Sequence, residues 1–160
     1  HFNKDKWYVS EIDIWIYYAK LMIKSKKKGR NIPIILLPMV NFEIATAFKK
    51  YDIFTIGDFI NKKNVLGKIR KRIRMKRKEY KKMIKLIDFL KIEKIDLDLA
   101  KSIQKAEILD VNDFLKLPNE EILTRLKDMM KKDSIERNEL SIEFIAEIKD
   151  KLREKKEVRK

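Results

Sequence analysis

The chain has 160 residues, which is enough for one large domain or two small ones with a buried core. It contains no cysteine, which excludes disulfide bonds and thiolate metal sites, and no run approaches the roughly eighteen apolar residues of a transmembrane helix. Its 40 Lys and Arg residues outnumber 25 Asp and Glu residues, and the net charge of +15 predicts a polyanionic partner.

The positive charge is concentrated in the first part of the chain. Residues 1–91 hold 24 Lys and Arg against 8 Asp and Glu, a net of +16, whereas residues 92–160 hold 16 against 17, a net of −1. Anion binding is therefore expected in the first half. With 44% apolar residues and only three glycines and three prolines, the composition is typical of an all-α globular protein.

Residues 1–31 are expected to form an N-terminal amphipathic helix followed by a basic linker. Ser10 and Asp13 resemble a capping box, and a helical apolar spacing follows at Ile12, Trp15, Ile16, Ala19, Met22 and Ile23. Trp7 and Tyr8 precede this helix and are candidates for stacking on unpaired bases or for packing on a partner protein. The first residue, His1, is not methionine. A cleaved organellar transit peptide would give such a start, and so would a fragment of a longer chain.

The sequence NIPIILLP at 31–38 predicts an extended connector, and an internal repeat follows at a spacing of 55 residues. Residues 42–60 align with residues 97–115. Each copy is predicted to form a helix, a turn and a second helix, which is capped by Thr55 or Asp110. Apolar periodicity alone would give part of the match, and the shared Asp-Phe pair favours duplication. The identical positions are Ala45/Ala100, Lys50/Lys105, Ile53/Ile108, Asp58/Asp113 and Phe59/Phe114.

Each copy is expected to continue with a longer helix, which gives a first unit at 32–91 and a second at 92–160. In the first unit one apolar stripe runs through the basic sequence at Leu66, Ile69, Ile73, Tyr80, Ile84, Ile87 and Leu90. In the second unit Pro118 and Asn119 open a helix, and Ser141 caps a last helix with Ile142, Ile145, Ile148 and Leu152 inward. The predicted fold is therefore two tandem helical units after an N-terminal helix.

Thirteen of the twenty-four residues from Lys62 to Lys85 are Lys or Arg, and Glu79 is the one acidic residue among them. Arginine presents a planar fork to phosphate oxygens and lysine a flexible point charge, so this segment is predicted to bind nucleic acid. The other interpretation is a solvated helix face in a lysine-rich protein. The candidate nucleic-acid-binding residues are Lys62, Lys63, Lys68, Arg70, Lys71, Arg72, Arg74, Lys76, Arg77, Lys78, Lys81 and Lys82.

No pattern in the sequence indicates catalysis. There is no glycine-rich phosphate loop, no Ser/His/Asp set and no metal-ligand spacing. The acidic pair Glu120 and Glu121 lies at a predicted helix start, where it complements the helix dipole. We therefore expect a non-enzyme with no cofactor and no metal.

Two stretches of the second unit resemble the C-terminal domain of the bacterial-type RNA polymerase alpha subunit, a helix-hairpin-helix-related fold. They are IEKIDLDLAKSIQKAEILDVNDFLKLPNEEIL at 92–123 and LSIEFIAEIKDKLRE at 140–154. ILDVNDF takes the place of the turn of that family, and AEIKDKL that of its final helix. The first unit is similar to a more distant copy, with IFTIGDF at the turn. The resemblance implies two tandem helix-hairpin-helix-like units.

The residues with which this family contacts DNA are mostly replaced. The family uses an Arg and an Asn on its first helix and a Gly-Lys-Lys-Ser sequence that opens its last helix. In the second unit these positions are Asp98 and Lys101, followed by Ser141, Ile142, Glu143 and Phe144. In the first unit the Arg position is Glu43, and the helix opening falls on Lys76, Arg77, Lys78 and Glu79. The resemblance therefore implies the fold and does not extend to promoter binding.

These features predict an RNA-binding structural subunit of a large ribonucleoprotein, such as an organellar ribosome, mitochondrial in preference to plastid. The first half would bind RNA, rRNA in particular, and the near-neutral second half would pack against neighbouring proteins. One alternative is a DNA-binding module of a transcription or repair complex. Another is an adaptor that places the basic helix on anionic lipid, without membrane insertion. That helix lacks exposed Trp or Phe on its apolar stripe, which ranks the adaptor last.

Overall fold

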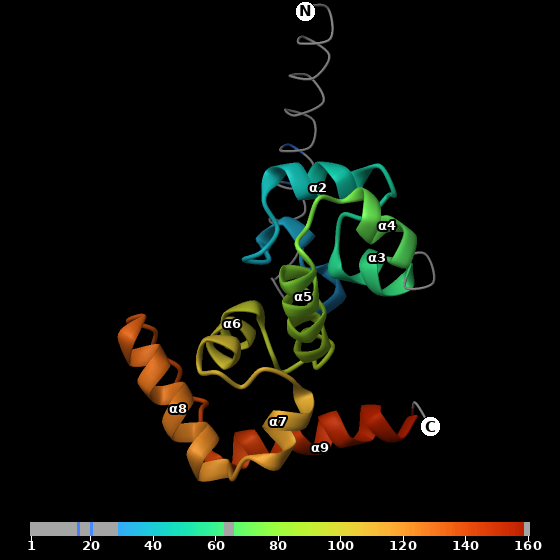
Figure 1. Cartoon of the computed structure of the whole chain (residues 1–160). Coiled ribbons are helices and arrows are strands. Elements are labelled where there is room, and N and C mark those ends of the chain that lie inside the picture. Colours follow the sequence, from blue (N-terminus) through green and yellow to red (C-terminus); the bar gives the residue numbers. More distant parts are fainter. Residues whose placement is uncertain (1–15, 17–19, 21–28, 63–65, 159–160) are drawn as a thin grey trace, which may run out of the picture. The chain divides into compact units, whose positions relative to one another are not determined.

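The computed structural model describes Ile16, Lys20 and residues 29–62 and 66–158. The described residues are all-α, as the composition predicts, and they contain no strand (Figure 1). The predicted N-terminal helix lies outside the described residues except for Ile16 and Lys20, and the side chain of Ile16 is exposed. Two 3-10 turns and eight α-helices are present in the described part: η1 (Gly29–Asn31), η2 (Ile34–Leu36), α2 (Phe42–Lys49), α3 (Ile56–Asn61), α4 (Leu66–Arg72), α5 (Arg77–Leu90), α6 (Leu97–Lys105), α7 (Val111–Lys116), α8 (Asn119–Lys132) and α9 (Ile142–Val158).

The chain forms two compact units that meet between Met83 and Ile84, inside helix α5. The first unit thus contains the start of α5, and the second contains its end. The segments 1–31, 32–91 and 92–160 expected from the sequence stay predictions. No helix in the described part of the chain is long and apolar enough to cross a membrane.

The segment expected to be an extended connector belongs to the core of the first unit. Ile32, Ile34 and Leu37 are buried, and η2 replaces the extended conformation at Ile34–Leu36. Two backbone bonds join this segment to the chain before α3. The N–H of Ile34 donates to the carbonyl of Phe54 at 2.8 Å, and the N–H of Ile56 donates to the carbonyl of Ile32 at 2.9 Å. The apolar run therefore serves packing, because its side chains fill space beneath α2 and α3.

Gly57 allows η1 to approach helix α3 closely. A Cβ atom at this position would lie 3.0 Å from Cβ of Arg30 and 3.1 Å from the carbonyl oxygen of Arg30. Real Cβ atoms rarely make such short contacts, so any larger residue would push the two elements apart.

The predicted helix–turn–helix of each repeat is confirmed at its caps. Asn41 accepts a bond from the N–H of Ile44 at 2.8 Å before α2, and Asp96 accepts one from Leu99 at 2.9 Å before α6. The second helices begin in the same way. Thr55 accepts from the N–H of Asp58 at 3.1 Å, and Asp110 accepts from the N–H of Asp113 at 2.8 Å. Each capping pair in one repeat is 55 residues from its counterpart in the other.

Aromatic rings form the centre of each unit. In the first unit the rings of Phe48 and Phe59 meet edge to face with centroids 5.9 Å apart, and the ring of Tyr80 lies 6.4 Å from that of Phe59. In the second unit Phe89 and Phe114 pack with centroids 5.8 Å apart. Phe59 and Phe114 are equivalent in the repeat, so the Asp-Phe pair supplies one core ring to each unit.

The second unit is completed by α8 and α9, which pack against each other, while α8 also contacts α6 and α9 also contacts α7. The predicted Ser141 cap is present, since its hydroxyl accepts from the N–H of Phe144 at 3.1 Å. Ile142, which was expected to face inward, is exposed, whereas Ile145 is buried. Lys149 is also buried. Its ammonium donates to the carbonyl of Leu117 at 2.5 Å, and burial lowers the pKa of Lys149.

The single long helix expected through the basic sequence is not formed, and that prediction is wrong. Helix α4 ends at Arg72 and α5 begins at Arg77. Between them the N–H of Met75 donates to the carbonyl of Ile73 at 2.6 Å, a bond that spans two residues instead of the four of an α-helix. A continuous helix would hold the like charges of Arg70 and Arg74 one turn apart, which is destabilising. Because of the break, Arg70 and Arg74 do not lie in the same helix, and Ile73 stays buried.

Candidate nucleic-acid interface

Four buried side chains fix the path of the segment that carries the cations. Ile69 and Ile73, at and just beyond the end of α4, are each 1% exposed, while Met83 is fully buried and Tyr80 is 8% exposed on α5. Except for Arg70, the Lys and Arg side chains between these anchors are exposed. We use the term basic face for the nine exposed residues Lys68, Lys71, Arg72, Arg74, Lys76, Arg77, Lys78, Lys81 and Lys82.

The other three predicted binding residues do not belong to this face. Arg70 is half-buried, and its guanidinium carbon lies 5.9 Å from the ring centroid of Tyr80, within the range of a cation–π contact. Lys62 is also half-buried, and its ammonium donates to the backbone carbonyl of Tyr51. Lys63 lies outside the described residues. Nine of the twelve predicted residues are therefore exposed.

The stacking of Arg70 on Tyr80 links the basic face to the core. Burial raises the pKa of Tyr80, and the charge of Arg70 opposes that rise. The ring of Tyr80 contacts both the guanidinium of Arg70 and the ring of Phe59. Arg70 therefore positions the end of α4, and it is less available than its neighbours for contacts with an external phosphate.

Glu79 is the one acidic residue in the sequence of the basic face. It pairs with Lys82 at 3.9 Å between exposed side chains, and such a pair contributes little to stability. In the second unit, by contrast, many Lys and Arg side chains pair with carboxylates of the same unit. These pairs are Lys91–Asp88, Lys94–Glu147, Lys105–Asp133, Arg125–Glu121, Arg137–Asp96, Arg137–Glu139, Lys151–Glu154 and Arg153–Asp150.

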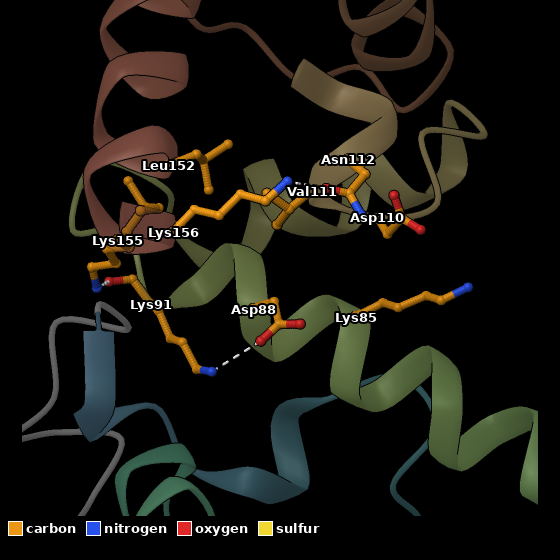
Figure 2. Close-up of a pocket in the computed structure, with 10 residues that line it drawn as sticks. Lys85, Asp88, Lys91, Asp110, Val111, Asn112, Leu152, Lys155 and Lys156 are labelled. Carbon is orange, nitrogen blue, oxygen red and sulfur yellow. Dashed lines mark hydrogen bonds and ion pairs between the residues drawn. The ribbon is translucent and has the colours of Figure 1, made fainter. Parts of the chain in front are cut away.

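A cavity of about 370 Å³ in the second unit is also lined by lysines, and three of them, Lys91, Lys155 and Lys156, are bonded to groups of the same unit (Figure 2). Lys91 pairs with Asp88 at 2.9 Å, and the ammonium of Lys155 donates to the carbonyl of Lys91. Lys156 donates to the side-chain oxygen of Asn112 at 2.9 Å. These contacts leave a surface of mixed charge, which is a weaker phosphate site than the basic face.

The residues that the family resemblance assigns to the opening of the last helix can be located in both units. Ser141 precedes α9, and Lys76 precedes α5, whose first residue is Arg77. The side chains differ in kind. In the first unit Lys76, Arg77 and Lys78 are exposed cations, whereas in the second unit Glu143 is an exposed acid. Only the first unit therefore presents positive charge at this place.

One residue of the interface was missed by reasoning from the sequence. Tyr51, together with Ile69, lines a cavity of about 330 Å³ beside Lys62, Lys68 and Arg72. The sequence pointed instead to Trp7 and Tyr8 as stacking residues, and both lie outside the described residues. A signal was present in the repeat, because the residue that corresponds to Tyr51 in the second copy is Ala106.

No family model, curated protein or solved structure matches this chain. The interpretation of the interface therefore depends on its charge, exposure and packing. The relation to the polymerase alpha-subunit domain stays a prediction.

Proposed function

We propose that this chain is a non-catalytic, RNA-binding structural subunit of a large ribonucleoprotein, such as an organellar ribosome, mitochondrial in preference to plastid. In this proposal its fold is two tandem helix-hairpin-helix-like units after an N-terminal amphipathic helix. The observation that carries the function is the basic face, where nine cations between Lys68 and Lys82 stand exposed with Glu79 as their one acidic neighbour in sequence.

The energetics of the basic face favour a bound polyanion. Exposed like charges on a folded surface repel one another, and salt screens this repulsion only in part. A phosphate backbone removes the repulsion and releases its condensed counterions when it binds. A protein that neutralises six to ten phosphates loses about 10³–10⁵ in affinity between roughly 50 and 200 mM salt. Nine cations place the basic face in that range.

RNA is favoured over promoter-type DNA by the residues at the family's contact positions. Asp98 and Glu143 are exposed acids in the second unit, and Glu43 is an exposed acid in the first. An acid at a phosphate contact repels the backbone. The ion pairs of the second unit support a different role for it, that of packing against neighbouring proteins.

The repeated geometry supports a tandem origin for the two units. The caps at Asn41 and Asp96, and those at Thr55 and Asp110, recur at the same spacing as the sequence matches. Duplication followed by divergence would leave one copy basic and the other neutral.

The test is the salt dependence of RNA binding, compared between two variants that lose the same charge. We expect wild-type protein to bind a structured RNA far more tightly at about 50 mM than at about 500 mM salt. The triple variant Lys76→Gln, Arg77→Gln, Lys78→Gln should lower the slope of log affinity against log salt by up to about three. The matched control is Lys127→Gln, Lys131→Gln, Lys132→Gln, which removes three exposed cations from α8 and should leave the slope unchanged.

Equal binding at both salt concentrations would remove the basis of the proposal. An equal effect of the two triple variants would show that binding follows net charge and not the basic face. Competition with duplex DNA separates the alternative function, since clear preference for the duplex would favour a DNA-binding module. Co-sedimentation of the native protein with a ribosomal subunit would identify the assembly and its compartment.

A further inference from the structure

The cavity lined by Tyr51, Lys62, Lys68, Ile69 and Arg72 combines cations with apolar side chains. Phosphate contacts alone would not require the apolar side chains. The cavity is formed by the end of α2, the residue after α3 and one side of α4, and its volume of about 330 Å³ lies at the lower end of small-ligand sites. Tyr51 is half-buried and, with Ile69, is one of the uncharged residues that line it, so part of the cavity wall is apolar.

Cations surround this apolar surface. Lys62, Lys68 and Arg72 all line the cavity, and the ammonium of Lys62 is held by the carbonyl of Tyr51. Lys68 and Arg72 are exposed members of the basic face and make no ion pair with another described residue. An inorganic anion would leave the ring of Tyr51 unused, and an apolar ligand would leave three cations unused. A nucleotide combines a flat apolar base with a phosphate and satisfies both kinds of surface.

The corresponding place in the second unit lacks both elements of this site. Ala106 replaces Tyr51 and Leu117 replaces Lys62 in the repeat. The carbonyl of Ala106 accepts a bond from Arg125 at 3.4 Å, and Arg125 is also paired with Glu121 at 2.7 Å. The same backbone carbonyl thus meets a cation in both units. Only in the first unit does that cation stand next to an aromatic ring without a carboxylate partner among the described residues.

We propose that this cavity receives one unstacked nucleotide of the bound RNA, whose base stacks on Tyr51 while Lys62, Lys68 and Arg72 contact the adjacent phosphates. The inference rests on the proposed RNA-binding function. It adds a specificity, namely a preference for RNA that contains an unpaired base. Proteins read RNA chiefly at loops and bulges, where unpaired bases stack on aromatic rings or on arginine planes. Both kinds of planar group line the cavity, since Tyr51 and Arg72 each contribute one.

The consequence is a preference for RNA that contains an unpaired base. Two hairpins that differ only in one bulged adenosine provide the probes, and binding is measured at a single salt concentration. Stacking of one base on an aromatic side chain changes affinity by about tenfold or more, so the bulged hairpin should bind at least about tenfold more tightly. Both hairpins make the same phosphate contacts with the basic face, so these contacts contribute equally to the two affinities and cancel in their ratio.

Variants at Tyr51 separate stacking from charge. Tyr51→Leu keeps apolar volume but removes the flat ring, so it should abolish the preference for the bulge, and the two hairpins should then bind with equal affinity. Tyr51→Phe keeps the ring and should keep the preference. A bulged 2-aminopurine gives a direct readout, because its fluorescence should be quenched by wild type and by Tyr51→Phe and not by Tyr51→Leu. Helical circular dichroism verifies that each variant is folded.

The possible failures are distinguishable. If wild-type protein binds both hairpins equally, with the salt dependence intact, the nucleotide site is wrong and the RNA-binding proposal stands. If Tyr51→Leu retains the bulge preference, the base is held elsewhere and the inference is likewise overturned. If neither hairpin binds in a salt-dependent way, the proposed function itself fails and the nucleotide site fails with it.

Discussion

Asp52 and Glu107 lie 55 residues apart and adopt the same left-handed backbone conformation, with φ of 58° and 64°. Each follows the first helix of its repeat. The next residue then closes the helix end, as Ile53 donates to the carbonyl of Phe48 and Ile108 donates to that of Ile103. Left-handed residues at this position are usually glycine, because any side chain with a Cβ atom is strained there. Two acidic residues in this conformation indicate helix ends that are not optimised for stability.

Glycine at such a helix end is therefore expected to stabilise the protein. Glu107→Gly should have a free energy of unfolding about 1 kcal/mol higher than Glu107→Ala, because alanine keeps the strained Cβ atom and glycine does not. Both variants remove the same exposed carboxylate, so charge is matched between them. Denaturant unfolding followed by circular dichroism measures the difference. Equal stability of the two variants would show that the left-handed conformation at Glu107 costs the fold nothing.

The paired aspartates of the repeat should respond differently to the same substitution. In the first unit Asp58 completes a capping box, because its carboxylate accepts from the N–H groups of Phe54 and Thr55, each at 3.0 Å. In the second unit the N–H of Asp113 is used by the cap, and its carboxylate is not part of a capping box.

Asp58→Ala should lower the free energy of unfolding by about 1–2 kcal/mol, since two backbone N–H groups lose their acceptor. Asp113→Ala should cost clearly less. Thermal and denaturant unfolding of the two variants provide the comparison. A larger loss for Asp113→Ala would mean that the capping box contributes little to the first unit.

Tyr80 should make stability sensitive to alkaline pH. Burial raises the pKa of its phenol above the ordinary value near 10, so the folded protein keeps the phenolic proton at a pH where the unfolded chain has lost it. The unfolded state then binds fewer protons than the folded state. The free energy of unfolding therefore falls as pH rises past 10, until the folded state also loses its proton.

Tyr80→Phe removes this titration and keeps the ring next to Phe59 and Arg70. The difference in unfolding free energy between wild type and Tyr80→Phe should stay constant below pH 10. Above pH 10 the free energy of unfolding of the wild type should fall relative to that of Tyr80→Phe. Ultraviolet absorbance of tyrosinate provides a second measurement, in which one tyrosine should titrate late. A difference that does not change with pH would indicate that the phenol is not held neutral by the fold.

Much of the secondary structure was predictable because its signals are local. Thr55, Asp110 and Ser141 each cap a helix through an N–H only three residues away, so the chain within one turn contains all the information. The internal repeat further predicted that residues 42–60 and 97–115 form equivalent helix–turn–helix segments.

The errors arose where packing overrides periodicity. The apolar stripe through the basic sequence predicted one helix, but α4 ends at Arg72 and α5 begins at Arg77, and Ile73 between them is buried. Ile84, on the same expected stripe, is 37% exposed. Ile34, which was assigned to a connector, is fully buried, and its own N–H is bonded to the carbonyl of Phe54, just before α3.

The sequence alone determined the helical class, the helix caps and the sign and place of the charge. A cap needs only neighbouring residues, and net charge is a sum over residues whatever their arrangement. Tertiary structure decided which cations became exposed, which one stacked on Tyr80, and that Tyr51 shares a cavity with Ile69 and Arg72. Such contacts join residues distant in sequence. They exist only after α4 has packed beside the end of α2, and no local pattern records that packing.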